Sequence, residues 1–181
     1  MKRALLVIDV QNEYITGKLP ISYPPNSFSN ILKVVDAANE KNIPVILIQH
    51  TSLAENAVTF KKGSNEWNIH PEILNKKHTQ VVEKNLPGGF TNTNLEAVLK
   101  DLGIDTVTIA GFMTQMCCDT TARQAMHMGY SVEFLSDATG TLQLSNSAGN
   151  ISAEDLHKAI LVTQAARFSK VLSSDEWISN L

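Results

Sequence analysis

The sequence has few cysteines and lacks long apolar runs. Its 181 residues include 2 cysteines, which are adjacent and therefore form neither a disulfide framework nor a common metal-ligand spacing. The first apolar run, residues 4–8, stops at Asp9 and is shorter than the roughly 7–15 residues of a secretory core segment. No run approaches the ~18 apolar residues of a membrane-spanning helix. We therefore expect a cytoplasmic protein with free thiols and no membrane partner.

The sequence also lacks a strong charge of either sign. It has 15 lysines and arginines against 18 aspartates and glutamates, a formal net charge of −3, so no nucleic-acid partner is indicated. Hydrophobic residues make up 43% of the chain, which argues against disorder. A chain of this length can bury roughly 70% of its unfolded surface in one core. We expect one domain over residues 1–181.

Apolar strand-like runs alternate with amphipathic helical segments. This alternation predicts parallel strands joined by right-handed crossovers, and hence a three-layer, Rossmann-like α/β fold. In such folds ligands bind at the carboxyl ends of the strands. The predicted strands are residues 4–10, 43–50, 79–84, 105–111, 130–136 and 169–172, and the predicted helices are residues 27–42, 94–102, 114–128 and 152–168.

Two long segments interrupt this alternation, residues 11–26 and residues 51–78. Loops of this length in a compact domain are usually functional walls or lids. The second segment contains Trp67 and His70. We expect both segments to lie over the strand ends.

Three reactive side chains follow predicted strands. Asp9 ends the first apolar run, Lys84 ends the third, and Cys117 falls in the first turn of the helix that Thr114 is expected to cap. A helix N-terminus favours thiolate over thiol, which would help Cys117 act as a nucleophile. Each residue alone has an ordinary structural explanation: a solvated carboxylate, a lysine reaching water or a small buried hydrophobe. If neighbouring strands bring them together, Asp9 can act as a base and Lys84 can orient it.

A nucleotide-binding site is a less favourable interpretation. Such a site needs a glycine-rich turn after the first strand, where backbone N–H groups hold phosphates. Residues 9–13 contain no glycine and include Asp9 and Glu13, which would repel a pyrophosphate. A catalytically silent binding protein remains a third alternative.

Four segments together resemble the isochorismatase-like cysteine hydrolases, which include nicotinamidases and N-carbamoylsarcosine amidohydrolase. The resemblance runs from residue 4 to about residue 172. Its motifs are LLVIDVQNEY (5–14), HPEI (70–73), VEKNLPGGFTNTNLEAVLKDLGIDTVTIAG (82–111) and GFMTQMCCDTTARQAMHMGY (111–130).

The resemblance implies a six-stranded, mainly parallel sheet and a catalytic triad of Asp9, Lys84 and Cys117. In the family pattern the nucleophile lies six residues after the glycine that closes the fourth strand, which selects Cys117 and leaves Cys118 for packing. The resemblance also implies a cis peptide bond before Met113 and an oxyanion hole formed by the N–H groups of Met113 and Cys117.

The implied activity is hydrolysis of an amide or carbamoyl C–N bond through a thioester, without a cofactor. Isochorismatases proper generally lack the cysteine, so Cys117 favours C–N hydrolysis. Nicotinamidases carry a metal-binding Asp-x-His after the second strand, whereas this chain has Gln49-His50-Thr51. We therefore expect no metal, although His50 and His70 could converge through the fold. Isochorismatase-type and nicotinamidase activities remain alternatives.

The substrate-binding residues are less well defined by sequence. Gln11, two residues beyond Asp9, is expected to hydrogen-bond near it, and His70 is expected to cap or pack its loop. Ligand pockets combine apolar walls with a few polar groups. The candidate substrate-binding residues are Gln11, Tyr14, His50, Phe60, Trp67 and Phe112. The expected partners are a small-molecule amide and further copies of the chain, as a dimer or tetramer.

Overall fold

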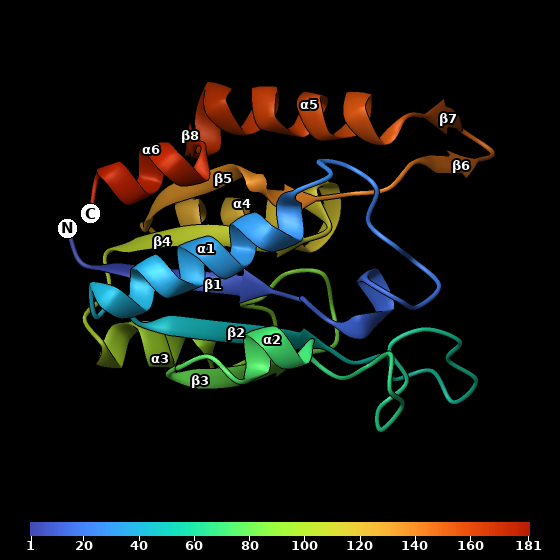
Figure 1. The fold of residues 1–181 in the computed structure, drawn as a ribbon, viewed down its shortest axis with the longest axis horizontal. Helices are drawn as coiled ribbons and strands as arrows, with labels where there is room; N and C mark the ends of the chain where they lie inside the picture. The colour runs from blue at the N-terminus through green and yellow to red at the C-terminus, as the bar shows by residue number, and fades with distance from the viewer.

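A six-stranded parallel sheet forms the centre of the computed structural model, which describes all residues from 1 to 181 (Figure 1). Its strand order is β3-β2-β1-β4-β5-β8, and every neighbouring pair is parallel. This confirms the predicted three-layer α/β fold. The strands are β1 (Arg3–Ile8), β2 (Val45–His50), β3 (Gln80–Lys84), β4 (Thr106–Phe112), β5 (Ser131–Gly140) and β8 (Lys170–Leu172).

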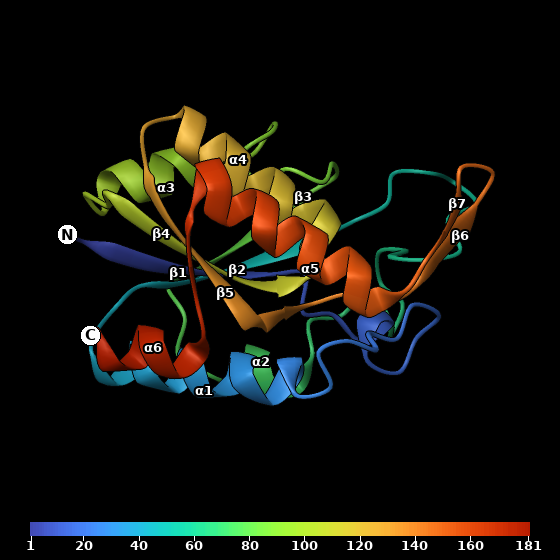
Figure 2. The same ribbon diagram turned by 90° about the horizontal axis from the view of Figure 1, so that it is seen from above.

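Helices cover both faces of the sheet, as the edge-on view makes plain (Figure 2). One face carries α1 (Ser27–Glu40), α2 (Pro71–Leu74) and α6 (Ser174–Ser179). The opposite face carries α3 (Leu95–Asp101), α4 (Asp119–His127) and α5 (Ala153–Thr163). The central strands are apolar on both faces because each face packs against helices.

The core consists of two clusters separated by the sheet. Along β1, Leu5 and Val7 join the cluster under α1, whereas Leu6 and Ile8 join the one under α3 and α4. Successive strand residues point to opposite faces, so one strand contributes to both clusters. All four side chains are essentially inaccessible to solvent.

The helix boundaries differ from the sequence prediction in two places. The segment predicted as one helix over 114–128 starts with a π-type turn, η2 (Thr114–Cys118), before α4. The segment over 152–168 ends in a second such turn, η3 (Gln164–Phe168). Ser152 caps α5, because its side chain accepts a hydrogen bond from the N–H of Asp155.

Thr114 is not the helix cap that the sequence suggested. The flanking residue of η2 is Met113, and no side chain caps that end. The hydroxyl of Thr114 instead lies 2.8 Å from Nδ1 of His157. The sequence prediction also missed several short elements: η1 (Asn12–Tyr14), α2, α6 and the hairpin of β6 (Leu144–Asn146) and β7 (Gly149–Ile151).

A close approach of β4 to β1 brings their carboxyl ends together. Gly111 is in register with Ile8, and its φ of +120° is rarely adopted by residues with side chains. A Cβ at this position would overlap the backbone of Ile8. Only glycine therefore allows η2 to begin beside the end of β1.

No helix has the length and apolar composition that a membrane crossing requires.

We predict that Gly111→Ala destabilises the fold by more than about 3 kcal/mol, because it adds a clash with Ile8 to an unfavourable φ. Gly129→Ala is the matched control. Gly129 also has a positive φ, +92°, but nothing lies within 4 Å of its added Cβ. That variant should lose only about 1 kcal/mol. Urea unfolding followed by circular dichroism measures both, and equal losses would contradict the packing argument.

Candidate active site

Asp9, Lys84 and Cys117 meet at the carboxyl edge of the sheet. Nζ of Lys84 lies 2.8 Å from Oδ2 of Asp9 and 3.2 Å from Sγ of Cys117. The side chains of Asp9 and Lys84 are both 0% exposed, and Cys117 is 7% exposed. The three residues that the sequence singled out therefore form one buried cluster.

Each member of the cluster is positioned by the end of a strand. Asp9 follows β1 with a positive φ of +52°, Lys84 is the last residue of β3, and Cys117 lies in η2 after β4. The three strands are not all neighbours, because β2 separates β1 from β3. The long side chain of Lys84 spans this gap. Its ammonium also lies 3.1 Å from the carbonyl oxygen of Leu86 and 3.4 Å from Nδ1 of His50 on β2.

The charges of the cluster stabilise one another. Burial alone would lower the pKa of Lys84, but the carboxylate of Asp9 and the hydrogen bonds to Asp9 and Cys117 outweigh it and raise that pKa above its ordinary value. Lys84 is therefore an ammonium. Apart from this ammonium, no N–H or O–H group of the protein donates to either carboxylate oxygen of Asp9.

The thiol of Cys117 differs from the sequence expectation. A helix N-terminus was expected to favour the thiolate, but burial raises the pKa of Cys117, and the nearby carboxylate of Asp9 raises it further. Lys84 opposes this shift without reversing it. Cys117 is consequently a neutral thiol at rest, with a carboxylate beside it to take its proton.

Cys118 belongs to the same core cluster as Cys117 but is not hydrogen-bonded to Lys84. It is completely buried in the core cluster that contains α3 and α4. Both cysteines are free thiols. The expectation that Cys118 is a packing residue is confirmed.

The backbone around Met113 offers a free hydrogen-bond donor next to Cys117. The peptide bond between Phe112 and Met113 is cis, as the family resemblance implied. The carbonyl of Met113 accepts bonds from Met116 and Cys118, whereas the N–H of Met113 donates to no backbone acceptor. An unpaired N–H in a residue that is only 7% exposed is uncommon and is available to a ligand.

Gln11 ties β1, β2 and the following loop together. Its side-chain Oε1 accepts from the N–H of His50 at 2.9 Å, and its Nε2 donates to the carbonyls of His50 and Trp67. Its backbone N–H donates to the carbonyl of Asp9 at 2.8 Å. Because these bonds occupy the side-chain amide, Gln11 holds the strand end and the loop in place around Asp9.

Aromatic rings form a continuous wall beside the cluster. Tyr14 contacts Phe60 and Phe112 with ring centroids 5.2 and 5.8 Å apart, and Phe60 contacts His50 at 5.1 Å. Phe112 is fully buried in the core behind Tyr14. Burial and the proximity of Cys117 raise the pKa of Tyr14, so its hydroxyl stays neutral. Tyr14, His50 and Phe60 therefore lie beside the cluster, and their role in substrate binding stays a prediction.

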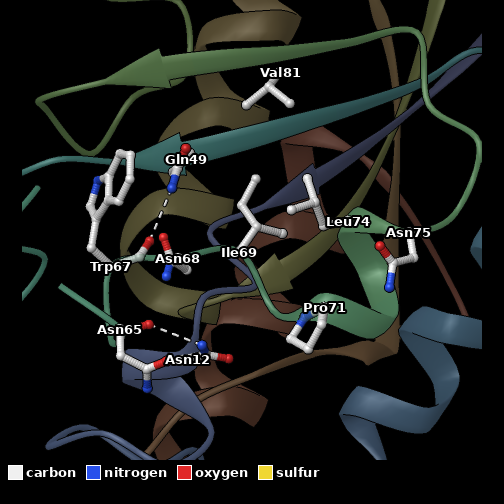
Figure 3. Close-up of a pocket in the computed structure, with 10 residues that line it drawn as sticks. All are labelled: Asn12, Gln49, Asn65, Trp67, Asn68, Ile69, Pro71, Leu74, Asn75 and Val81. Carbon is white, nitrogen blue, oxygen red and sulfur yellow. Dashed lines mark hydrogen bonds between the residues drawn. The ribbon is translucent and has the colours of Figure 1, made fainter. Parts of the chain in front are cut away.

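Trp67 lines a different cavity. Its indole Nε1 donates to Oγ1 of Thr51, and its carbonyl accepts from Gln11 and Gln49. The side chains in Figure 3 border a cavity of about 530 Å³ beside α2, the end of β2 and the start of β3. Its lining is Asn12, Gln49, Asn65, Trp67, Asn68, Ile69, Pro71, Leu74, Asn75 and Val81, and it includes none of the three clustered residues.

The histidines do not provide a metal-binding set. His70 accepts a hydrogen bond from the N–H of Glu72 at the start of α2 and packs edge-on against Phe28, so its predicted capping role is confirmed. Nδ1 of His50 faces the ammonium of Lys84. No group of three or more His, Cys, Asp or Glu side chains has a metal-binding arrangement. The donors around His50 do not fit a metal ion.

His157 supports the cysteine-bearing turn, and sequence reasoning missed this role. Its Nε2 lies 2.8 Å from the carbonyl oxygen of Ser136, which can only accept, so Nε2 carries the proton. Nδ1 is then the acceptor for the hydroxyl of Thr114. Burial lowers the pKa of His157, which keeps the ring neutral. No motif or spacing links residues so far apart in the sequence.

Comparison with known proteins gives one consistent relationship. The family model for the isochorismatase domain matches residues 3–176. A crystal structure of a candidate isochorismatase from Burkholderia xenovorans is 45% identical, with a TM-score of 0.95, over 98% of this chain and 86% of that one.

Two curated relatives extend this relationship. Nicotinamidase 3 of Arabidopsis thaliana is 31% identical over 96% of this chain and 85% of its own length. A secreted isochorismatase effector of Verticillium dahliae is 33% identical over 95% of this chain and 88% of its own length.

We predict that Lys84→Met destabilises the protein by about 3–5 kcal/mol, because it leaves the carboxylate of Asp9 buried without its counter-ion. The double variant Asp9→Asn with Lys84→Met should recover most of this loss, since both charges are removed. Urea unfolding of the wild type, both single variants and the double variant measures the coupling. Additive losses would show that the ion pair does not contribute as a unit.

We also predict a pH dependence of stability that comes from His157. Its pKa is lowered in the folded protein, so below its ordinary value of 6.5 the unfolded chain takes up a proton that the folded chain does not. Stability should therefore fall as the pH drops through 6.5, by at most about 1.4 kcal/mol per pH unit from this group.

The variant His157→Gln should reduce this slope between pH 7 and 5.5, as measured by urea unfolding at each pH. Thr114→Val is the matched control, because it removes the hydrogen bond but keeps the titrating ring. It should lower stability at every pH and retain the slope. An unchanged slope in His157→Gln would contradict the assignment.

Proposed function

The chain belongs to the isochorismatase family of hydrolases, and we propose that it cleaves a C–N bond of a small amide or carbamoyl compound through Cys117. The observation that carries this proposal is the buried contact of Lys84 with both Asp9 and Cys117. It supplies a base, a fixed positive charge and a nucleophile within one cluster. These are the groups that covalent hydrolysis requires.

The first half of the proposed reaction forms a thioester. Asp9 takes the proton of the Cys117 thiol as Sγ attacks the carbonyl carbon of the substrate. The N–H groups of Met113 and Cys117 stabilise the negative charge that develops on the carbonyl oxygen. The C–N bond then breaks, and Asp9 returns the proton to the leaving nitrogen. The neutral resting thiol supports this sequence, because deprotonation then coincides with attack.

The second half hydrolyses the thioester. Asp9 takes a proton from a water molecule, which attacks the acyl carbon and forms a second tetrahedral intermediate. The C–S bond breaks, the proton returns to Sγ of Cys117, and the acid product leaves. Lys84 holds the carboxylate of Asp9 in place at both stages, because its ammonium lies 2.8 Å from Oδ2.

Two related activities are weaker candidates. Vinyl-ether hydrolysis, the reaction of isochorismatases proper, needs no nucleophile, whereas Cys117 lies in contact with Lys84. Nicotinamide hydrolysis has the support of the Arabidopsis relative, but the donors around His50 do not fit the metal site expected of that group. A silent binding protein would have no need for the buried charges.

We further propose that the protein is a homo-oligomer, a dimer or a tetramer, acting in the cytoplasm on a small molecule and binding no nucleic acid. Light scattering after size-exclusion chromatography tests the oligomeric state. Because the fungal relative is named as secreted, cell fractionation should include the culture medium.

We predict that Cys117→Ala lowers turnover by at least about a thousandfold, since it removes the nucleophile. Cys118→Ala is the matched control: its thiol lies in the core, so turnover should stay within a fewfold of wild type. Ammonia release from a panel of primary amides and carbamoyl compounds, nicotinamide included, provides the measurement. Retained turnover in Cys117→Ala, or its loss only in Cys118→Ala, would refute the proposed mechanism.

A further inference from the structure

We propose that this site selects an uncharged substrate that carries N–H on its scissile nitrogen, and that it rejects compounds with a carboxylate next to the reacting group. The inference rests on the proposed function and specifies the substrate class of the same site. It follows from the hydrogen-bonding capacity and the charges around Cys117.

The first argument concerns the carboxylate of Asp9. It is completely buried; Lys84 is the only N–H or O–H donor of the protein that reaches it, and the thiol of Cys117 is its one further hydrogen-bonding neighbour. A buried carboxylate normally accepts several hydrogen bonds, and unfilled acceptor positions are costly. A substrate N–H would fill one of them. A tertiary amide or an ester has no such donor to offer.

The second argument concerns the one cation at the site. The ammonium of Lys84 is already shared among Asp9, Cys117, the carbonyl of Leu86 and Nδ1 of His50. Besides burial, Lys84 lowers the pKa of His50 and Asp9 raises it. An incoming carboxylate would therefore find the ammonium of Lys84 already in contact with other groups. It would also face the carboxylate of Asp9, to which it has no hydrogen to donate.

The three arginines of the chain lie elsewhere. Arg3 makes a two-pronged bond to Glu133 at the amino end of the sheet, far from the strand ends that carry Asp9. Arg123 pairs with Asp119 on α4 and stacks over Phe168. Arg167 is exposed at the end of η3. The bidentate guanidinium contact that commonly recognises a carboxylate is thus not provided.

Two exposed lysines of the loops that follow β1 and β2 are also directed to other groups. Lys62 pairs with Glu83, and Lys18 donates to the carbonyl of Val58; both lysines are exposed.

The walls of the site carry no charge. Tyr14 is a neutral phenol, and Phe60 presents a ring to both Tyr14 and His50. Burial lowers the pKa of His50, and the nearby ammonium of Lys84 lowers it further, so this ring is also neutral. Since its Nδ1 faces an ammonium, Nδ1 is the acceptor and Nε2 carries the proton. These walls match a flat or apolar acyl group.

Alkylation of Cys117 tests the charge selectivity without a known substrate. Iodoacetamide and iodoacetate are nearly equal in size, but the first carries a neutral amide where the second carries a carboxylate. In both reactions the sulfur displaces iodide, a C–S bond replaces the C–I bond, and the thiol proton passes to Asp9. We expect the ratio of the iodoacetamide rate to the iodoacetate rate to be at least tenfold higher for Cys117 than for free N-acetylcysteine at the same pH.

Variants of the wall give a matched comparison. Phe60→Arg places a cation beside the site and should bring the ratio back towards that of N-acetylcysteine, whereas the neutral Phe60→Gln should not. Mass spectrometry assigns the modified residue, and Cys118→Ala should react as wild type does. A ratio equal to that of N-acetylcysteine, or no alkylation of Cys117 by either reagent, would overturn the proposal.

Hydrolysis of paired substrates completes the test. Succinamide should release ammonia at least tenfold faster than succinamate, which carries a carboxylate, and N,N,N′,N′-tetramethylsuccinamide, which has no amide N–H, should not release dimethylamine. Equal rates for these compounds, together with dependence on Cys117, would refute the selectivity but leave the proposed function intact. Turnover that persists in Cys117→Ala would instead refute the proposed function, whatever the alkylation ratio.

Discussion

The ion pair between Asp9 and Lys84 is the interaction on which the arrangement of the site depends. Two buried charges are stable only if they face each other, because each one alone would carry a large desolvation cost. The strands that bear them are separated by β2, so β1, β2 and β3 must end level with one another. Gly111 then lets the chain after β4 approach β1, and Cys117 comes to lie against the same ammonium.

Much of this arrangement could be predicted from the sequence, because parallel strands that are buried on both faces consist of nearly continuous runs of apolar residues. The runs ending at Ile8 and Lys84 predicted β1 and β3 to within a few residues. The rule that ligands bind at carboxyl strand ends then directed attention to Asp9, Lys84 and Cys117. The family resemblance identified the same three residues and the cis peptide bond before Met113.

The features that sequence reasoning missed depend on contacts between distant segments. The bond between Thr114 and His157 joins η2 to α5, and neither residue has a local signal for it. The protonation of Cys117 is a similar case. Its position at a helix start favours a thiolate, but burial and the carboxylate of Asp9 outweigh that local effect. Tertiary packing decided both outcomes.

The resting protonation of Cys117 also has a consequence for oxidative damage. Peroxides react with thiolates rather than thiols, and the first product, a sulfenic acid, would disable the nucleophile. A cysteine that gives its proton to Asp9 only when a substrate arrives is a thiolate, and so open to such oxidants, for a small part of each catalytic cycle. The burial that makes Cys117 a weak acid therefore also acts as chemical protection between turnovers.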